Sequence, residues 1–168
     1  MMLGLSLPAF TTLHVIISLI GIASGVLLAL TMLGKHHAPG LAALFLVTTI
    51  ATSVTGFMFP SAKIGPPHIV GAISLIVLAL CVWALYGKHL RGRWRAVYIV
   101  TVMFSLYLNA FVGVVQTFQK IEPFRALAPT QSEPPFLVAQ TLTLGLFVVL
   151  GLLSVKRFPL TQNTVNQH

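Results

Sequence analysis

The sequence predicts an all-helical integral membrane protein with five transmembrane helices, and two observations lead to this fold class. Hydrophobic residues make up 57% of the 168 residues and charged residues only 7%, which is far from the balance of a soluble domain. Five apolar stretches are each long enough to cross the hydrocarbon core of a bilayer, which takes about 20 helical residues. The connections give no hint of a second domain, so residues 1–168 are predicted to form a single transmembrane domain.

We expect the five helices at residues 10–33, 41–59, 68–86, 96–118 and 136–155. The first is predicted to be a retained helix rather than a secretory signal, because no Lys or Arg precedes Lys35 and because it exceeds a typical signal core in length. Prolines before the third and fifth stretches are typical of helix starts. Residues 119–135 form the one long connection, and residues 160–168 are predicted to be a flexible tail.

A similar pair of short segments, one at the start and one at the end of an apolar run, occurs twice in the sequence. Leu13-His14-Val15-Ile16 opens the first apolar run and Gly34-Lys35-His36 closes it, whereas Pro67-His68-Ile69-Val70 opens the third run and Gly87-Lys88-His89 closes it. Each run is followed by another apolar stretch, so the predicted unit is a two-helix hairpin used twice, followed by a fifth helix. This repeat would place His14 and His68 at matching depths on one side of the membrane.

The basic residues predict an orientation. Seven of them fall on one side of the predicted helices (Lys35, Lys88, Arg91, Arg93, Arg95, Lys156 and Arg157), and three on the other (Lys63, Lys120 and Arg125). Because the more basic side is normally cytoplasmic, we expect the N-terminus outside and the C-terminus inside. The formal charge of +8 then reflects contact with the lipid bilayer and not with nucleic acid, since the basic residues sit at helix ends.

Polar side chains inside the predicted spans gather in the outer half. An unpaired amide in hydrocarbon costs several kcal/mol, so these side chains must face protein or a cavity. We therefore predict an outward-facing polar pocket, capped by residues 119–135 and formed by His14, His68, Asn109, Gln116, Gln119, Lys120, Glu133 and Gln140. The alternative is that the same side chains form only a few buried hydrogen bonds. The GxxxG segment Gly21–Gly25 predicts a close helix–helix contact.

The pair His14 and His68 suggests redox chemistry. Two imidazoles at one depth can supply both axial ligands of a b-type haem, and with Glu133 or Met58 they could instead hold a transition metal. They could also hydrogen-bond a quinone. No nucleophilic triad, carboxylate pair, phosphate loop or CxxC motif is present, so hydrolysis and phosphoryl transfer are not expected.

Three functions from different classes follow from these residues. The first is a membrane redox module that binds haem b or quinone in the outer leaflet. The second is a binder or carrier of a small apolar or amphipathic molecule without redox chemistry. The third is an accessory subunit of a larger membrane complex, or a homo-oligomer, for which the apolar helix faces would be enough. Whether the protein is an enzyme is left open.

Two segments, Ala51-Thr52-Ser53-Val54-Thr55-Gly56-Phe57 and the run from Leu127 to Phe136 (LAPTQSEPPF), resemble those of a family of small bacterial inner-membrane proteins. The resemblance covers most of the chain and implies a multi-pass protein of the bacterial inner membrane, with no particular activity. The layout of helical hairpins with a histidine near one end also resembles that of b-type membrane cytochromes, which implies haem at His14 and His68.

Overall fold

The computed structural model describes residues 4–60 and 65–159, and the regular elements of this part are all helices. They are α1 (Leu7–Leu33), α2 (Pro39–Phe57), α3 (Pro66–Val82), η1 (Trp83–Gly87), α4 (Arg93–Lys120), α5 (Glu122–Leu127) and α6 (Pro134–Arg157). Five helices are long and apolar enough to cross a membrane, with α3 and η1 forming one span. The all-helical class is therefore confirmed. Membrane insertion and the hairpin repeat stay predictions, and Lys63 and the tail 160–168 lie outside the described residues.

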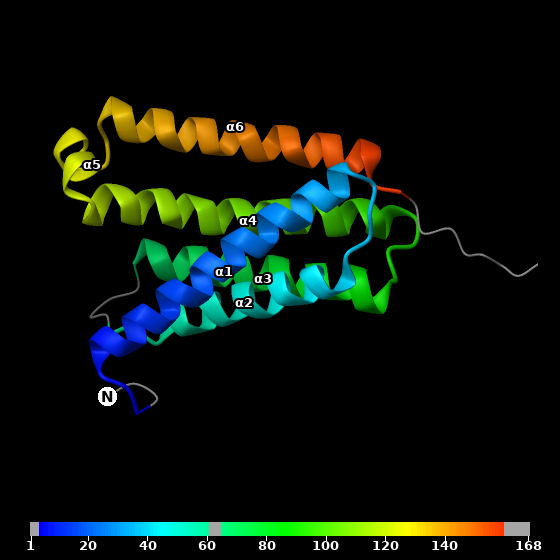
Figure 1. Ribbon diagram of the computed structural model, residues 1–168, viewed down its shortest axis with the longest axis horizontal. Coiled ribbons are helices and arrows are strands. Elements are labelled where there is room, and N and C mark those ends of the chain that lie inside the picture. The colour runs from blue at the N-terminus through cyan, green and yellow to red at the C-terminus, as the bar shows by residue number, and fades with distance from the viewer. Residues whose placement is uncertain (1–3, 61–64, 160–168) are drawn as a thin grey trace, which may run out of the picture.

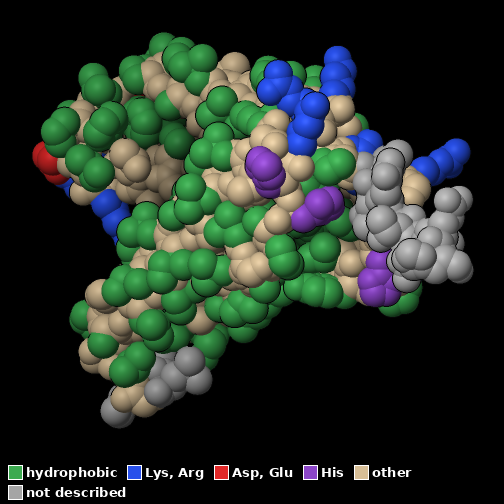
Figure 2. Space-filling model, turned by 45° about the vertical axis from the view of Figure 1, so that its right-hand side comes forward, with side chains coloured by type: hydrophobic (Ala, Val, Ile, Leu, Met, Phe, Trp, Pro, Cys, Tyr) green, Lys and Arg blue, Asp and Glu red, His purple; other side chains and the backbone are tan. Residues whose placement is uncertain are grey.

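The helices form an elongated bundle around α4, which packs against α1, α3, α5 and α6 (Figure 1). α1 pairs with α2 and runs obliquely across α4, so that it approaches α6 at one end of the bundle and departs from α4 at the other (Figure 1). We call the end near α5 the α5 end. The opposite end, which carries Lys35, Lys88, Arg95 and Lys156, is the basic end, and its Lys and Arg side chains gather on the right of Figure 2.

The long helices begin two or three residues before the expected positions. Ser6 caps α1, because its hydroxyl accepts a hydrogen bond from the Ala9 N–H at 3.4 Å. α2, α3 and α6 each start at a proline, at Pro39, Pro66 and Pro134. Proline suits the first turn, where its missing N–H would have had no partner inside the helix. The apolar pattern alone misses these turns because they project beyond the apolar stretch.

The connection at residues 119–135 contains the six-residue helix α5. Pro123 occupies the first turn of this short helix, where proline is tolerated. α5 ends at Leu127, just before Pro129, and the buried Ala128 that follows packs with Phe118 and Phe136 in a small apolar cluster. The segment is therefore folded back onto the ends of α4 and α6, which fixes its position relative to the bundle.

The two predicted hairpins end differently at the basic end. α1 stops at Leu33, whereas α3 continues into the π-helical turn η1. Lys88 follows this turn, and its ammonium lies over the rings of Trp83 and Trp94 at 5.4 and 5.6 Å from their centroids. Such cation–π contacts suit a membrane interface, where aromatic rings and basic groups meet.

The main core lies between the middle of the bundle and its basic end, where α1 packs against both α2 and α4. A Cβ atom added to Gly25 would lie 2.6 Å from Leu106 Cδ1 and 2.8 Å from Phe45 Cε2. Both of these side chains are fully buried. The close contact predicted from Gly21–Gly25 is therefore found, and it joins α1 to two helices at once.

The basic end of α6 is attached to α4 by Arg95. The guanidinium Nη1 donates hydrogen bonds to the carbonyl oxygens of Val155, at 2.9 Å, and of Phe158. Val155 is in the last turn of α6, where carbonyl groups lack partners within the helix and carry the negative end of the helix dipole. A cation at this position therefore both completes the hydrogen bonding and stabilises the helix end.

Candidate functional site

The side chains proposed for an outer pocket make several separate contacts. Each contact joins two elements, and together they connect α1 to α2, α2 to α4, α4 to α6, and the 128–133 segment to α4. His14, His68, Gln116 and Lys120 lie toward the α5 end, and Asn109 lies near the middle of α4.

His14 contacts the end of α2. Its Nδ1 lies 2.7 Å from Thr55 Oγ1, and its ring packs edge-on against Phe59 with centroids 5.1 Å apart. The Thr55 hydroxyl donates to the carbonyl oxygen of Ala51 at 2.7 Å, so its proton is already used. The His14 Nδ1–H is then the donor toward Thr55, and Nε2 of the neutral ring is left as a hydrogen-bond acceptor.

The hydrogen bonding of His68 is the reverse of that of His14, because its Nδ1 accepts a hydrogen bond. The backbone N–H of Gly65 donates to His68 Nδ1 at 3.2 Å, and a backbone N–H can only donate. A neutral His68 therefore carries its proton on Nε2. The ring packs against Phe57 with centroids 5.9 Å apart. Thr55, which contacts His14, and Phe57, which contacts His68, are two residues apart in the sequence. Their side chains therefore leave α2 in directions about 200° apart, on nearly opposite faces of the helix.

Asn109 and Gln140 form hydrogen bonds between helices. Asn109 Nδ2 donates to Thr49 Oγ1 at 3.3 Å, and a Cβ at Gly21 would lie 3.6 Å from that nitrogen. The Asn109 amide therefore lies beside both α1 and α2. Gln140 Nε2 donates to the carbonyl oxygen of Phe111 at 3.2 Å, which connects α6 to α4. Its Oε1 is buried without a hydrogen-bond partner among the described residues.

Gln119, in the last turn of α4, and Glu133, just before α6, contact the segment between these two helices. Gln119 Nε2 donates to Gln131 Oε1 at 3.3 Å, and Gln131 Nε2 donates to the carbonyl oxygen of Val115 at 3.1 Å. The carboxylate of Glu133 accepts hydrogen bonds from Thr130 and Ser132, whereas Arg125 pairs with Glu122 at 3.0 Å.

Gln116 and Lys120 are both exposed and lie one turn apart on α4. One turn before Gln116, Gly113 contacts α1, since a Cβ there would lie 3.8 Å from Ile22 Cδ1. Beyond this contact α1 and α4 diverge, and Figure 2 shows a notch on its left side, between the part built by α4–α6 and the arm that ends in the start of α1. Lys120 and His14 interact electrostatically. We call the region between the diverging ends of these helices the α1–α4 notch; α1 carries His14 there, and α4 carries Gln116 and Lys120.

Metal ligands do not cluster in the part of the chain that the structure describes. No group of three or more His, Cys, Asp or Glu side chains there could hold an ion. Met58, a further candidate metal ligand, directly follows the last residue of α2 and lies between Phe57 and Phe59 in the sequence.

Sequence analysis missed the residues that complete these contacts. Thr49, the partner of Asn109, is one of several threonines in α2 and has no distinctive position in the pattern. Gln131, which joins the 128–133 segment to α4, lies in a proline-rich stretch without helical periodicity. A polar residue on a membrane helix signals that a partner exists, but the pattern does not contain the identity of that partner.

The turn before α6 should respond to acid. Desolvation is the largest single influence and raises the pKa of Glu133, but hydrogen bonds from the Thr130 hydroxyl and from backbone N–H groups such as those of Thr130 and Ser132 together outweigh it and hold the pKa below the ordinary value of 4.5. A lowered pKa means that the turn gains stability from the carboxylate above the unfolded-state pKa and loses it as pH falls through the folded-state value. A carboxyl-carbon NMR titration should therefore give a midpoint for Glu133 below 4.5.

The matched variant for this titration is Thr130→Val, which removes the hydroxyl donor and keeps the shape of the side chain. The Glu133 midpoint should move upward in this variant. A midpoint that is the same in both proteins would show that the hydroxyl does not stabilise the carboxylate.

Comparisons of the chain with protein-family models, with curated proteins and with solved structures each find no match.

Proposed function

We propose that this chain is a multi-pass protein of a bacterial cytoplasmic membrane, with its N-terminus outside, and that it binds the head group of a quinone-type molecule in the α1–α4 notch. The observation that carries the proposal is the hydrogen bonding of His14. Because Thr55 uses the Nδ1–H, His14 Nε2 remains an acceptor, and His14 lies near the start of α1, at the end of the bundle where α4 carries the donors Gln116 and Lys120.

This set of groups matches both redox states of a quinone. The carbonyl oxygens of the oxidised form accept hydrogen bonds, which the Lys120 ammonium and the Gln116 amide can donate. The hydroxyl groups of the reduced form donate, and His14 Nε2 can accept from one of them. The notch opens along the apolar faces of α1 and α4, where residues such as Leu13 and Ile16 are exposed, so an isoprenoid tail would remain in lipid.

The same hydrogen bonds favour quinone over haem. Axial coordination by two histidines requires a lone pair on one nitrogen of each ring that faces the iron. For His68, the bond from Gly65 occupies the Nδ1 lone pair and leaves a proton on Nε2. A quinone site at His14 requires nothing of His68.

The test is quinone binding by the purified chain. A short-tailed benzoquinone should bind in detergent at one site per chain, and Lys120→Met should weaken binding by about 10-fold or more, as expected when a charged hydrogen bond is lost. His14→Phe, which keeps an aromatic ring but no acceptor, should weaken binding of the quinol more than of the quinone. Lys156→Met removes an exposed lysine at the basic end and should leave both affinities unchanged.

Each alternative has its own outcome. A haem absorbance band that disappears in both His14→Phe and His68→Phe would replace the quinone proposal by haem binding. Absence of any quinone or haem binding, together with copurification in a larger membrane complex, would overturn the proposal in favour of an accessory subunit. Saturable binding of other amphipathic molecules at the notch with no preference for quinone would support a carrier without redox chemistry.

A further inference from the structure

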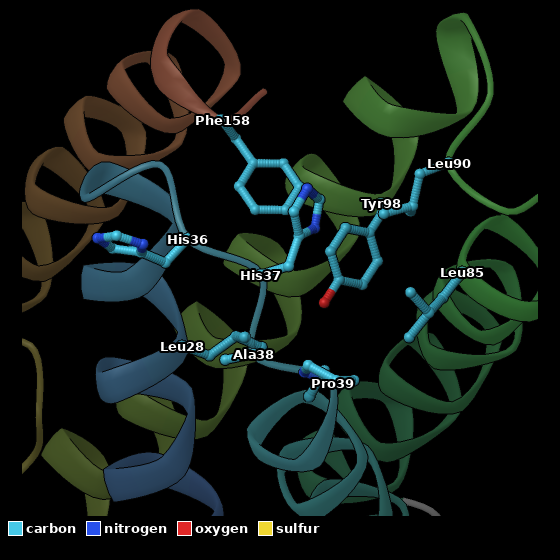
Figure 3. A pocket seen from close by; sticks show the side chains of 10 residues that line it. Leu28, His36, His37, Ala38, Pro39, Leu85, Leu90, Tyr98 and Phe158 are labelled. Atoms are coloured by element: carbon cyan, nitrogen blue, oxygen red, sulfur yellow. The ribbon is translucent and has the colours of Figure 1, made fainter. Parts of the chain in front are cut away.

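A cavity of about 120 Å³ lies at the basic end, opposite the α1–α4 notch. Its walls come from α1, the connection between α1 and α2, the starts of α2 and α4, η1, and the residues that follow η1 and α6. Its lining includes Leu28, His37, Leu85, Tyr98 and Phe158. All five are labelled in Figure 3, and most of the lining is apolar.

Tyr98 supplies the main polar group of this cavity. Its side chain is only 3% exposed, and its hydroxyl points into the cavity (Figure 3). Among the described residues the ring of this side chain packs against the ring of Phe158. Tyrosine hydroxyls in apolar surroundings are normally hydrogen-bonded, so this one is suited to bond a molecule in the cavity.

Phe158, whose ring packs against that of Tyr98, is held in a defined position. Phe158 packs edge-on against His37, with centroids 4.6 Å apart, and its backbone carbonyl accepts a hydrogen bond from Arg95. The phenyl ring is buried. His37 is exposed and lies at the rim, where its imidazole can contact a molecule that enters from the membrane surface.

We propose that this cavity binds a planar six-membered ring that carries a hydroxyl or carbonyl oxygen, as in a phenol. The oxygen bonds to the Tyr98 hydroxyl, and the ring packs against Leu28, Leu85 and Phe158. An enclosed apolar cavity of ~150 Å³ holds one benzene molecule. A cavity of about 120 Å³ that opens at His37 therefore takes one ring with an edge toward the opening. This site shares no residue with the α1–α4 notch and does not depend on its function.

The probe is 4-fluorophenol, titrated into the full chain in detergent micelles and followed by fluorine NMR, with empty micelles as the baseline for partitioning. The wild-type chain should show saturable binding above that baseline. Tyr98→Phe preserves the ring and should weaken binding about fivefold, which is typical for one neutral hydrogen bond. Fluorobenzene, which lacks the oxygen, should bind both proteins equally.

Two further variants test the location. Tyr107→Phe, at a half-buried tyrosine of α4 outside the cavity, should leave 4-fluorophenol binding unchanged. Leu85→Phe adds volume at the half-buried wall and should abolish binding of both probes. The proposal is overturned if there is no saturable binding above empty micelles, which would mean that the cavity holds only water. Equal affinity of wild type and Tyr98→Phe, or unchanged binding in Leu85→Phe, would also overturn it.

Discussion

Replacing Gly25 by valine is expected to lower the free energy of unfolding by about 3 kcal/mol, the upper end of the usual cost of overpacking. The first added carbon alone would lie 2.6 Å from Leu106 Cδ1 and 2.8 Å from Phe45 Cε2. Both neighbours are fully buried and packed on all sides, so neither can move without displacing others. Because α1, α2 and α4 meet at this point, the helices themselves must separate.

The measurement is equilibrium unfolding in mixed detergent micelles with increasing sodium dodecyl sulfate, followed by circular dichroism. Gly145→Val is the matched control, since a Cβ at this exposed position of α6 would meet nothing within 4 Å. The control should unfold near the wild-type midpoint, whereas Gly25→Val should unfold at clearly lower denaturant. Equal midpoints for the two variants would contradict the close approach of the three helices.

Replacing Arg95 by alanine should lower the free energy of unfolding by about 2 kcal/mol, because hydrogen bonds that involve a charged partner contribute roughly 1.5–3 kcal/mol to stability. The variant leaves the carbonyl groups of Val155 and Phe158 without their donor at the end of α6. It also removes a cation from the negative end of the helix dipole. We expect the last turns of α6 to open locally, with faster hydrogen exchange around residues 152–158 than elsewhere in the helix.

Arg93→Ala is the control for the charge, because Arg93 lies two residues earlier and is exposed. It should change stability by less than about 0.5 kcal/mol, as is usual for surface positions. Arg95→Lys should fall between the two, since it keeps the charge but loses the planar donor geometry. Uniform exchange along α6 in Arg95→Ala would show that the guanidinium does not hold this end of the helix.

The spans could be predicted from the sequence because each is a local property. About 20 apolar residues without charge can be accommodated in a bilayer only as a helix, whatever the neighbours do. The helix starts at Pro39, Pro66 and Pro134 lie outside this pattern, since the first turn is defined by capping and by proline geometry, not by hydropathy. The short helix α5 was missed for a related reason: proline excludes the interior of a helix but is compatible with its first turn.

In the candidate site, too, the sequence predicts some features and only the packing of the helices decides others. The amides of Asn109 and Gln140 could be predicted to need partners, because hydrocarbon offers none. That these partners are Thr49 and the carbonyl group of Phe111 depends on which helix faces which. The proton positions on His14 and His68 likewise depend on contacts with Thr55 and Gly65, and the sequence contains no information on them.

By itself, then, the sequence determined that the chain forms five long apolar helices, that its basic residues gather at one end, and that its buried amides must be paired. Each of these follows from the transfer free energy of single residues or single segments. Only the tertiary structure decided that Gly25 lies against Leu106 and Phe45, that Nδ1 of His14 lies against Thr55, and that Tyr98 faces a cavity. These depend on the packing of side chains from helices distant in the sequence, which hydropathy does not encode.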